Sequence, residues 1–159
     1  MAEIEQELKD FLGYWFAGWM RGMQTLDDAS QKIILSECGK ACAQSHTIQV
    51  FRQAKQNSLD METFLQELSS KDPAYQFERT GPNTIQATYS RCGCDLVRLG
   101  LVTSPTLCEC SAVNLQENLQ ESLGKTVSIA IESSILRGGS RCVLRATFDD
   151  EMEFGQAAN

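Results

Sequence analysis

Histidine and proline are scarce in this 159-residue chain, which holds one histidine, His46, and three prolines. The chain also lacks a His-Glu-x-x-His sequence, a phosphate-binding glycine loop and a dinucleotide-binding fingerprint. Each of these motifs marks an enzyme class through a physical mechanism, so their absence excludes the enzymes that depend on them. Any chemistry must therefore be sought in other residues.

Runs of basic residues are missing as well. Fourteen Lys and Arg residues stand against 21 Asp and Glu residues, which gives a formal net charge of −7. Non-specific affinity for nucleic acid comes from clustered Lys and Arg. We therefore expect no nucleic-acid partner, and we interpret the net charge as serving solubility.

Long apolar runs are the third absence. The N-terminus, MAEIEQELKD, is acidic, whereas a secretory signal begins basic and continues into an apolar stretch. The most apolar stretch, residues 11–20, is shorter than the about 20 residues that span a bilayer. These observations predict a cytoplasmic protein without a membrane partner. In such a reducing compartment its seven cysteines, an odd number, are not expected to form a disulfide framework.

Length and composition are typical of one globular domain. Hydrophobic residues make up 42% of the chain and charged residues 22%, and no repeat or linker interrupts it. We predict a single domain over residues 1–159. Residues 1–70 would form a helical layer, and residues 75–150 a sheet plus a helix with a cysteine-rich loop.

Three amphipathic helices are predicted in the first part of the chain. Residues 3–25 place large apolar side chains, among them Trp15 and Trp19, at three- and four-residue spacing. This wide stripe favours a helix buried in the core. The alternative is a subunit interface, and hence a homodimer through the N-terminal helix. Residues 28–56 and 59–69 give the second and third helices.

The apolar period then changes from 3.6 to 2. Residues 75–89 alternate as a β-hairpin, residues 91–110 are irregular, and Ser111 is expected to cap a helix that ends at Gly124. A strand over 126–132 follows. The last strand should present an inner face made of Cys142, Leu144, Ala146 and Phe148.

We expect the acidic tail beyond the last strand to fray. The predicted fold class is α+β, with N-terminal helices packed on a four-stranded antiparallel sheet made of two hairpins joined by a helix.

Two Cys-x-Cys pairs lie in the irregular stretch. In extended backbone the side chains of residues i and i+2 point the same way. Zinc prefers four tetrahedral ligands of thiolate or imidazole. We therefore predict a metal site, with zinc as the metal, at Cys92, Cys94, Cys108 and Cys110. The alternative is that these cysteines are small buried hydrophobes.

The remaining cysteines form a second candidate group. Cys38, Cys42 and His46 share one face of the predicted second helix, and Cys142 points inward from the last strand. We predict that these four residues line a ligand-binding cavity, with core packing as the alternative. Cys42 and His46 are the only thiol and base that the sequence itself places together, but no orienting third residue can be named. The catalytic residues therefore stay unassigned.

The C-terminal part resembles the 4-vinyl reductase-like family, a set of small α+β ligand-binding modules related to trafficking-complex subunits. The resemblance rests on a Cys before a helix, a strand ending in Glu, a Gly-containing turn and a Cys on the final strand. Here those positions are Cys108 or Cys110, Glu132, Gly138 or Gly139, and Cys142. The chain departs from the family at Ser133-Ser134-Ile135, where members carry a further Cys. The chain is also similar to the aminothiazoline-carboxylate hydrolase-like family.

These resemblances imply a helix-covered antiparallel sheet, dimerisation through N-terminal helices and an apolar pocket for a small molecule. The predicted function is a cytoplasmic small-molecule or metal-binding module with a cysteine-lined site, of the hydrocarbon-binding kind. One alternative is a thiol- or metal-dependent hydrolase of a small heterocycle. The other is a non-catalytic structural dimer.

Overall fold

The computed structural model describes residues 2–154, and its side chains from residue 5 onward. The elements follow in the order α1 (Ala2–Met23), α2 (Asp28–Cys42), the π-helical turn η1 (Ala43–Thr47), α3 (Ile48–Gln56), α4 (Met61–Lys71), β1 (Tyr75–Gly81), β2 (Thr84–Tyr89), α5 (Asp95–Arg98), α6 (Leu107–Leu123), β3 (Val127–Ser133), the 3₁₀ turn η2 (Ile135–Arg137) and β4 (Cys142–Phe148).

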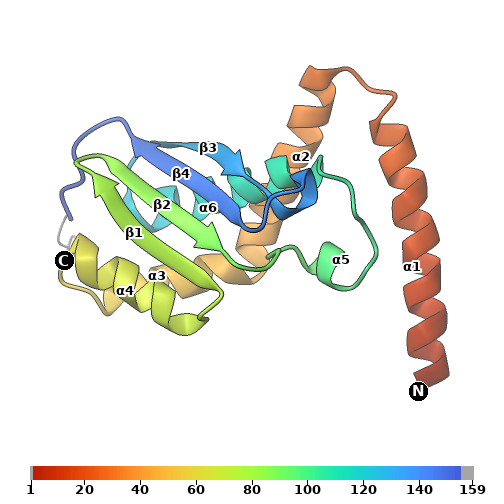
Figure 1. The fold of residues 1–159 in the computed structure, drawn as a ribbon, viewed down its shortest axis with the longest axis horizontal. Helices are drawn as coiled ribbons and strands as arrows, with labels where there is room; N and C mark the ends of the chain where they lie inside the picture. Colours follow the sequence, from red (N-terminus) through yellow and green to blue (C-terminus); the bar gives the residue numbers. More distant parts are fainter. Residues whose placement is uncertain (1, 155–159) are drawn as a thin grey trace.

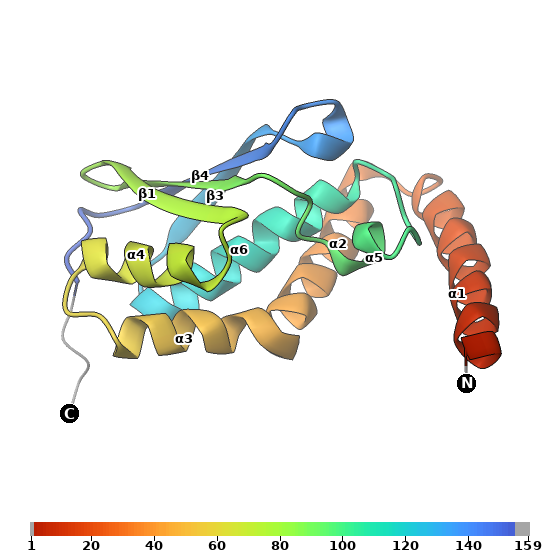
Figure 2. The ribbon, with the colours of Figure 1, turned by 60° about the horizontal axis from the view of Figure 1, so that its bottom comes forward.

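The four strands form one antiparallel sheet in the order β1-β2-β4-β3, so the two hairpins meet through their second strands (Figure 1). Helices α3, α4 and α6 cover one face of this sheet (Figure 2). The opposite face is polar: Gln86 donates a hydrogen bond to Glu78 over 3.0 Å, and Arg145 pairs with Glu132 over 2.9 Å. The predicted α+β class with a helix-covered antiparallel sheet is confirmed.

The main core lies between the sheet and these helices. Its strand side chains come from alternate positions of the two central strands, as the period of 2 requires. Phe64 of α4 and Leu119 of α6 face them and are fully buried. Burying one such side chain contributes about 1.5–3 kcal/mol. The sheet positions of this core are Ile85, Ala87, Leu144, Ala146 and Phe148.

A second, smaller core holds the end of α1. Met20 and Met23 are buried there against Leu35 of α2 and against Val102 and Leu107, which flank the start of α6. The rest of α1 projects from the body of the molecule (Figure 1). The prediction that the whole helix lies in the core is therefore wrong, because the body covers only one side of its last turns.

Residues 28–56 form one continuous helical path, as predicted, but not one regular α-helix. The turn η1 widens it to π geometry between α2 and α3. A π turn inserts one extra residue into a helix, which changes the direction of all side chains beyond it. The sequence pattern gave no sign of this insertion, because the apolar positions on each side are still consistent with helical spacing.

Helix α6 begins four residues earlier than Ser111, the predicted cap. Backbone N–H groups of Leu107 and Cys108 donate to the carbonyls of Ser104 and Pro105 and so start a helical turn. Proline fits here because its fixed φ suits the first turn of a helix. The predicted C′ residue is confirmed, since Gly124 ends α6 with a φ of 64°.

The acidic tail packs against the body as far as residue 154, which corrects the expectation that it frays. Met152 is buried, and the ring of Phe154 lies 6.0 Å from that of Phe64 and 3.2 Å below the Lys55 ammonium. The last five positions, 155–159, lie outside the described residues. Within residues 2–154, no helix has the length and apolar character that crossing a bilayer requires.

Helices α2 and α6 pack backbone to backbone at Gly39. A Cβ atom built on Gly39 would lie 2.7 Å from the carbonyl oxygen of Cys110 and 2.7 Å from the Cβ of Val113. Real Cβ atoms do not tolerate such distances, so only glycine allows this packing. The contact brings the second half of α2 directly against the first turns of α6.

We predict that Gly39→Ala lowers the free energy of unfolding by about 1–3 kcal/mol, because the added methyl group forces the two helices apart. Gly22→Ala is the matched control, since a Cβ at Gly22 meets nothing within 4 Å and alanine favours a helix. Urea denaturation of both variants would measure the difference. A Gly39→Ala protein as stable as the unchanged chain would contradict the packing described.

Candidate functional site: a thiol cluster

All seven cysteines gather where α2, α6, the segment before α5 and the start of β4 meet. Cys110 lies within electrostatic range of Cys38, Cys42 and Cys94. Cys92 lies within range of the cysteines at positions 94, 108 and 142. We call these seven residues the thiol cluster. The cluster thus brings together residues as far apart in the sequence as Cys38 and Cys142, which are separated by 104 positions.

The outer part of the cluster is a triangle of thiols from three different elements. Cys42 ends α2 and is exposed, while Cys94 and Cys110 are half-buried and pack against the second core. Cys42 feels the charges of Cys94 and Asp95, and its sulfur is hydrogen-bonded by the side chain of Asn114. This triangle joins α2, the loop that leads into α5, and α6.

The inner part of the cluster contacts the turn between β3 and β4. The sulfur of Cys108 lies 2.9 Å from the hydroxyl of Ser134, and both groups are buried. The backbone N–H of Ile135 donates to the sulfur of Cys142 over 3.5 Å. The first contact holds the turn against the N-terminal end of α6, and the second ties the turn to the start of β4.

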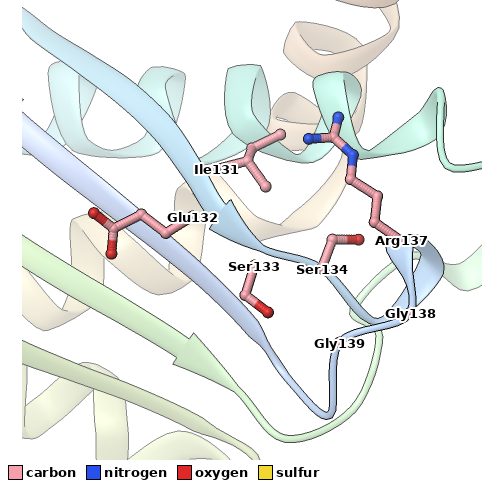
Figure 3. A pocket seen from close by; sticks show the side chains of 7 residues that line it. All are labelled: Ile131, Glu132, Ser133, Ser134, Arg137, Gly138 and Gly139. Carbon is pink, nitrogen blue, oxygen red and sulfur yellow. The ribbon is translucent and has the colours of Figure 1, made fainter.

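A hollow of about 280 Å³ lies on the other side of this turn (Figure 3). Its lining is largely polar, and its charged side chains already have partners: Arg137 pairs with Glu109 over 2.8 Å and Glu132 with Arg145. This polar lining differs from the apolar ligand pocket that the family resemblance implies. The residues around it are Ile131, Glu132, Ser133, Ser134, Arg137, Gly138 and Gly139.

Burial raises the pKa of the Cys42, Cys92 and Cys110 thiols above the ordinary value for cysteine, and the charges of neighbouring cysteines raise it further. For Cys110 the pKa rises to about 12. A raised pKa keeps each sulfur protonated at neutral pH, whereas nucleophilic cysteines need a lowered pKa. These three thiols are therefore poor nucleophiles.

The structure separates some residues that the sequence grouped. Cys108 and Cys110 lie in α6 and not in extended backbone, so their side chains point to different sides: Cys108 toward Ser134 and Cys110 toward α2. The expectation that this pair shares one direction is wrong. His46 lies in the π turn and is exposed, and its spacing from Cys42 is no longer that of a regular α-helix.

The described residues contain no group of three or more His, Cys, Asp or Glu side chains placed to hold a metal ion. The metal-binding module predicted from the sequence is therefore wrong. The prediction fails because Cys108 and Cys110 lie in a helix, where their side chains point to different sides. The four predicted ligands are therefore divided between the inner and outer parts of the cluster. Zinc at these particular thiols stays a prediction from the sequence alone.

Sequence reasoning missed a buried polar network beside the cluster. Thr47 of the π turn accepts hydrogen bonds from Asn114 over 3.2 Å and from Asn118 over 3.0 Å, and Asn118 also donates to Asn114 over 3.1 Å. Asn118 is fully buried. Two asparagines four residues apart, next to the apolar Leu115 and Leu119, were the available signal, because unpaired amides are rare on a buried helix face.

We predict a graded reactivity of the thiols toward iodoacetamide in the native protein. Exposed Cys38 should react at least about tenfold faster than buried Cys108, because the reagent must reach the thiolate. The rate at Cys42 should keep increasing between pH 8 and pH 10, since its raised pKa leaves little thiolate at the lower pH. Peptide mapping by mass spectrometry measures each site, with urea-unfolded protein as the control. Equal native rates would contradict the arrangement.

No family model matches the chain, and no curated protein matches it in sequence. Among solved structures it is similar to a trafficking protein particle complex subunit 3 from Naegleria fowleri, a structure in which that protein is covalently bound to palmitic acid. The match covers 96% of this chain and 99% of the other, with a TM-score of 0.53 and 8% sequence identity. At this identity the likeness shows the fold alone.

This comparison corrects the function predicted from the sequence. It gives no support to the 4-vinyl reductase-like or the aminothiazoline-carboxylate hydrolase-like family, and it supports only a fold of the kind found in a trafficking-complex subunit. A small-molecule or metal-binding module is the wrong function, because the similar solved structure is a subunit of a trafficking complex and the described residues hold no metal group. The fold is an α+β fold of the kind found in such a subunit.

Proposed function

We propose that the chain is a non-catalytic subunit of a protein assembly in vesicle trafficking, and that it pairs with a second copy of itself through α1. The observation that carries the proposal is the bare apolar face of this helix. The side chains of Leu8, Phe11 and Trp15 are 54%, 60% and 53% exposed. The fold comparison supports the same class of function, because it extends over almost the whole of both chains.

The exposed residues form a stripe along the part of α1 that projects from the body. They recur at three- and four-residue spacing and so lie on one side of the helix. Phe16 and Trp19 extend this apolar sector toward the buried Met20 and Met23. Helices gain most of their stability in water from tertiary packing of an apolar face. A partner that covers the stripe would supply this packing.

The charges on α1 favour an antiparallel second copy as the partner. Its first half carries Glu5, Glu7 and Asp10 with one lysine, and its last turn carries Arg21. A parallel pair would bring the two acidic halves together. An antiparallel pair brings the acidic half of each helix alongside the basic end of the other, and it also opposes the two helix dipoles.

Glu7 and Arg21 are close to four turns apart and so lie on nearly the same side of α1. When two identical helices pack antiparallel, equivalent flanks face each other around the two-fold axis. The Glu7 flank of one copy would therefore face the Arg21 flank of the other. The pairing can therefore be tested by reversing the charges of these two residues.

We predict that the full chain is a dimer at 10 µM or above, with twice the chain mass of 17.7 kDa, and that Trp15→Glu makes it a monomer. A buried carboxylate without a partner is too costly for such an interface to keep. Light scattering after size exclusion gives the mass. The matched control is Leu59→Glu, which changes a 93% exposed leucine outside α1 and should leave a dimer. A monomeric unchanged chain, or a dimeric Trp15→Glu chain, would refute the pairing.

The orientation has its own prediction. Arg21→Glu should weaken the dimer severalfold at low salt, because it places like charges along the flanks. Adding Glu7→Arg in the same chain should recover the lost affinity, since the opposite charges face each other again. Sedimentation equilibrium at low and high salt measures both constants. If the double variant binds no more tightly than Arg21→Glu, the antiparallel arrangement is wrong.

A further inference from the structure

The two edges of the sheet differ in how their outward backbone groups are paired. Strand β1 is one edge. The N–H of Tyr75 donates to the carbonyl of Asp72, directly after α4, over 3.0 Å. The N–H of Phe77 donates to the hydroxyl of Ser69 in α4 over 2.9 Å. A further strand would need these N–H groups, so helix α4 and the residue after it close this edge.

Strand β3 forms the other edge of the sheet (Figure 1). The N–H of Asp149, beyond the end of β4, donates to the carbonyl of Thr126, just before β3. Hydrogen-bonded positions alternate along an antiparallel pair, so Ser128 and Ala130 bond to β4. The N–H and C=O groups of the residues between them therefore point away from β4, toward the open side.

Other parts of the chain occupy only the beginning of this edge. At Val127, Gln116 donates to the carbonyl over 2.9 Å, and the N–H donates to Gln120 over 3.3 Å. Among the described residues, none bonds to the outward N–H and C=O groups of Ile129 and Ile131. The register shifts directly after Ile131. An open edge of two residues thus remains, between the two glutamines and the bulge.

The side chains beside the open edge indicate what fits on it. Ile129 and Ile131 are half-buried on the helix-covered face, so part of each apolar side chain is uncovered. Ser128, Ala130 and Glu132 are exposed on the opposite face. An added strand would lay every second side chain against the two isoleucines. Apolar residues suit those positions, and polar residues suit the positions between them.

The turn at the end of β3 adds a preference in charge. Residues 133–142 hold Arg137 and Arg141 and no Asp or Glu, in a chain whose net charge is −7. Arg137 pairs with Glu109, whereas exposed Arg141 forms no ion pair with any described residue. The carbonyl of Arg141 accepts from Ser133, which lines the hollow at this end of the strand (Figure 3). An acidic side chain suits this end.

We propose that the open edge of β3 binds an extended segment of a partner protein, which joins the four-stranded sheet as an additional strand antiparallel to β3. The segment begins with acidic residues and continues with apolar residues at every second position. Antiparallel addition lays its beginning at the turn, near Arg141. Its apolar side chains then lie against Ile131 and Ile129 in succession.

A second copy of the chain is a poorer occupant of this edge. Its own β3 is blocked at Val127 by the same two glutamines. Pairing β3 with β3 would also bring two α6 helices side by side on one face of the joined sheet. Each α6 carries three glutamates and no Lys or Arg, so like charges would meet.

The test uses the full chain and a synthetic acetylated peptide amide in which two aspartates precede alternating valine and threonine. Amide hydrogen exchange followed by NMR measures the contact at each residue. Without peptide, the N–H groups of Ile129 and Ile131 should exchange faster than those of Ser128 and Ala130. Saturating peptide should slow exchange at both isoleucines at least about tenfold, because their N–H groups enter new hydrogen bonds.

Matched peptides and variants test the geometry. Methylating the valine nitrogens removes the N–H groups that face β3 and should weaken binding at least about tenfold. Methylating the threonine nitrogens, which face away, should have a much smaller effect. Moving the aspartates to the other end of the peptide should weaken binding, as should Arg141→Glu. Arg98→Glu, a change of an exposed arginine in α5, is the control and should not.

No binding at millimolar peptide would overturn the proposal, as would binding that leaves exchange at Ile129 and Ile131 unchanged. Equal binding of the valine-methylated peptide would overturn it too. Slow exchange at both isoleucines without peptide would do the same, because a second copy would then occupy the edge. Trp15→Glu should bind the original peptide with unchanged affinity, so the outcome is separate from that of the pairing through α1.

Discussion

The close contact between α2 and α6 at Gly39 is the constraint on which the rest of the structure depends. Helix α6 packs on the sheet with one side and on α2 with the other, so it is the layer common to both cores. Because no side chain separates the two backbones at Gly39, the flanking cysteines of α2 lie beside Cys110. The position of the thiol cluster therefore follows from the packing of α2 against α6.

The two cores differ in how fully the chain encloses them. The main core is enclosed by three helices and the sheet, and its largest side chains are fully buried. The second core is small and ends where α1 leaves the body. Helix α1 is anchored at one end, and the apolar stripe along the rest of it is not covered by the chain itself. The proposed pairing supplies the missing surface from an identical helix, which requires no second kind of subunit.

The sequence was sufficient for the sheet and for most helices, because their apolar periods of 2 and 3.6 are determined locally. The inner face of β4 with Leu144, Ala146 and Phe148 was predicted correctly for this reason. The start of α6 was not, since the Cys-x-Cys spacing of Cys108 and Cys110 was interpreted as extended backbone when it lies in a helix.

Two further features depend on contacts between distant segments. Periodicity shows that α1 has an apolar stripe, but it does not show which part of the molecule covers it. The gathering of seven thiols is likewise a property of the tertiary fold, since positions near 40, 93, 109 and 142 meet only after the sheet and α6 are assembled. The Thr47–Asn114–Asn118 network belongs to the same class, because its two sides come from η1 and α6.

The π turn η1 makes the direction of the α3 side chains independent of the direction of the α2 side chains. In a regular α-helix each added residue turns the chain by about 100°, so the faces of α2 and α3 would be tied to each other. The extra residue at residues 43–47 resets that angle midway. As a result α2 can present Gly39 and its cysteines to α6 while α3 presents Phe51 and Ala54 to the main core. Deleting one residue from this turn would therefore rotate α3 about its axis relative to α2. That rotation would disturb the side-chain packing of both cores.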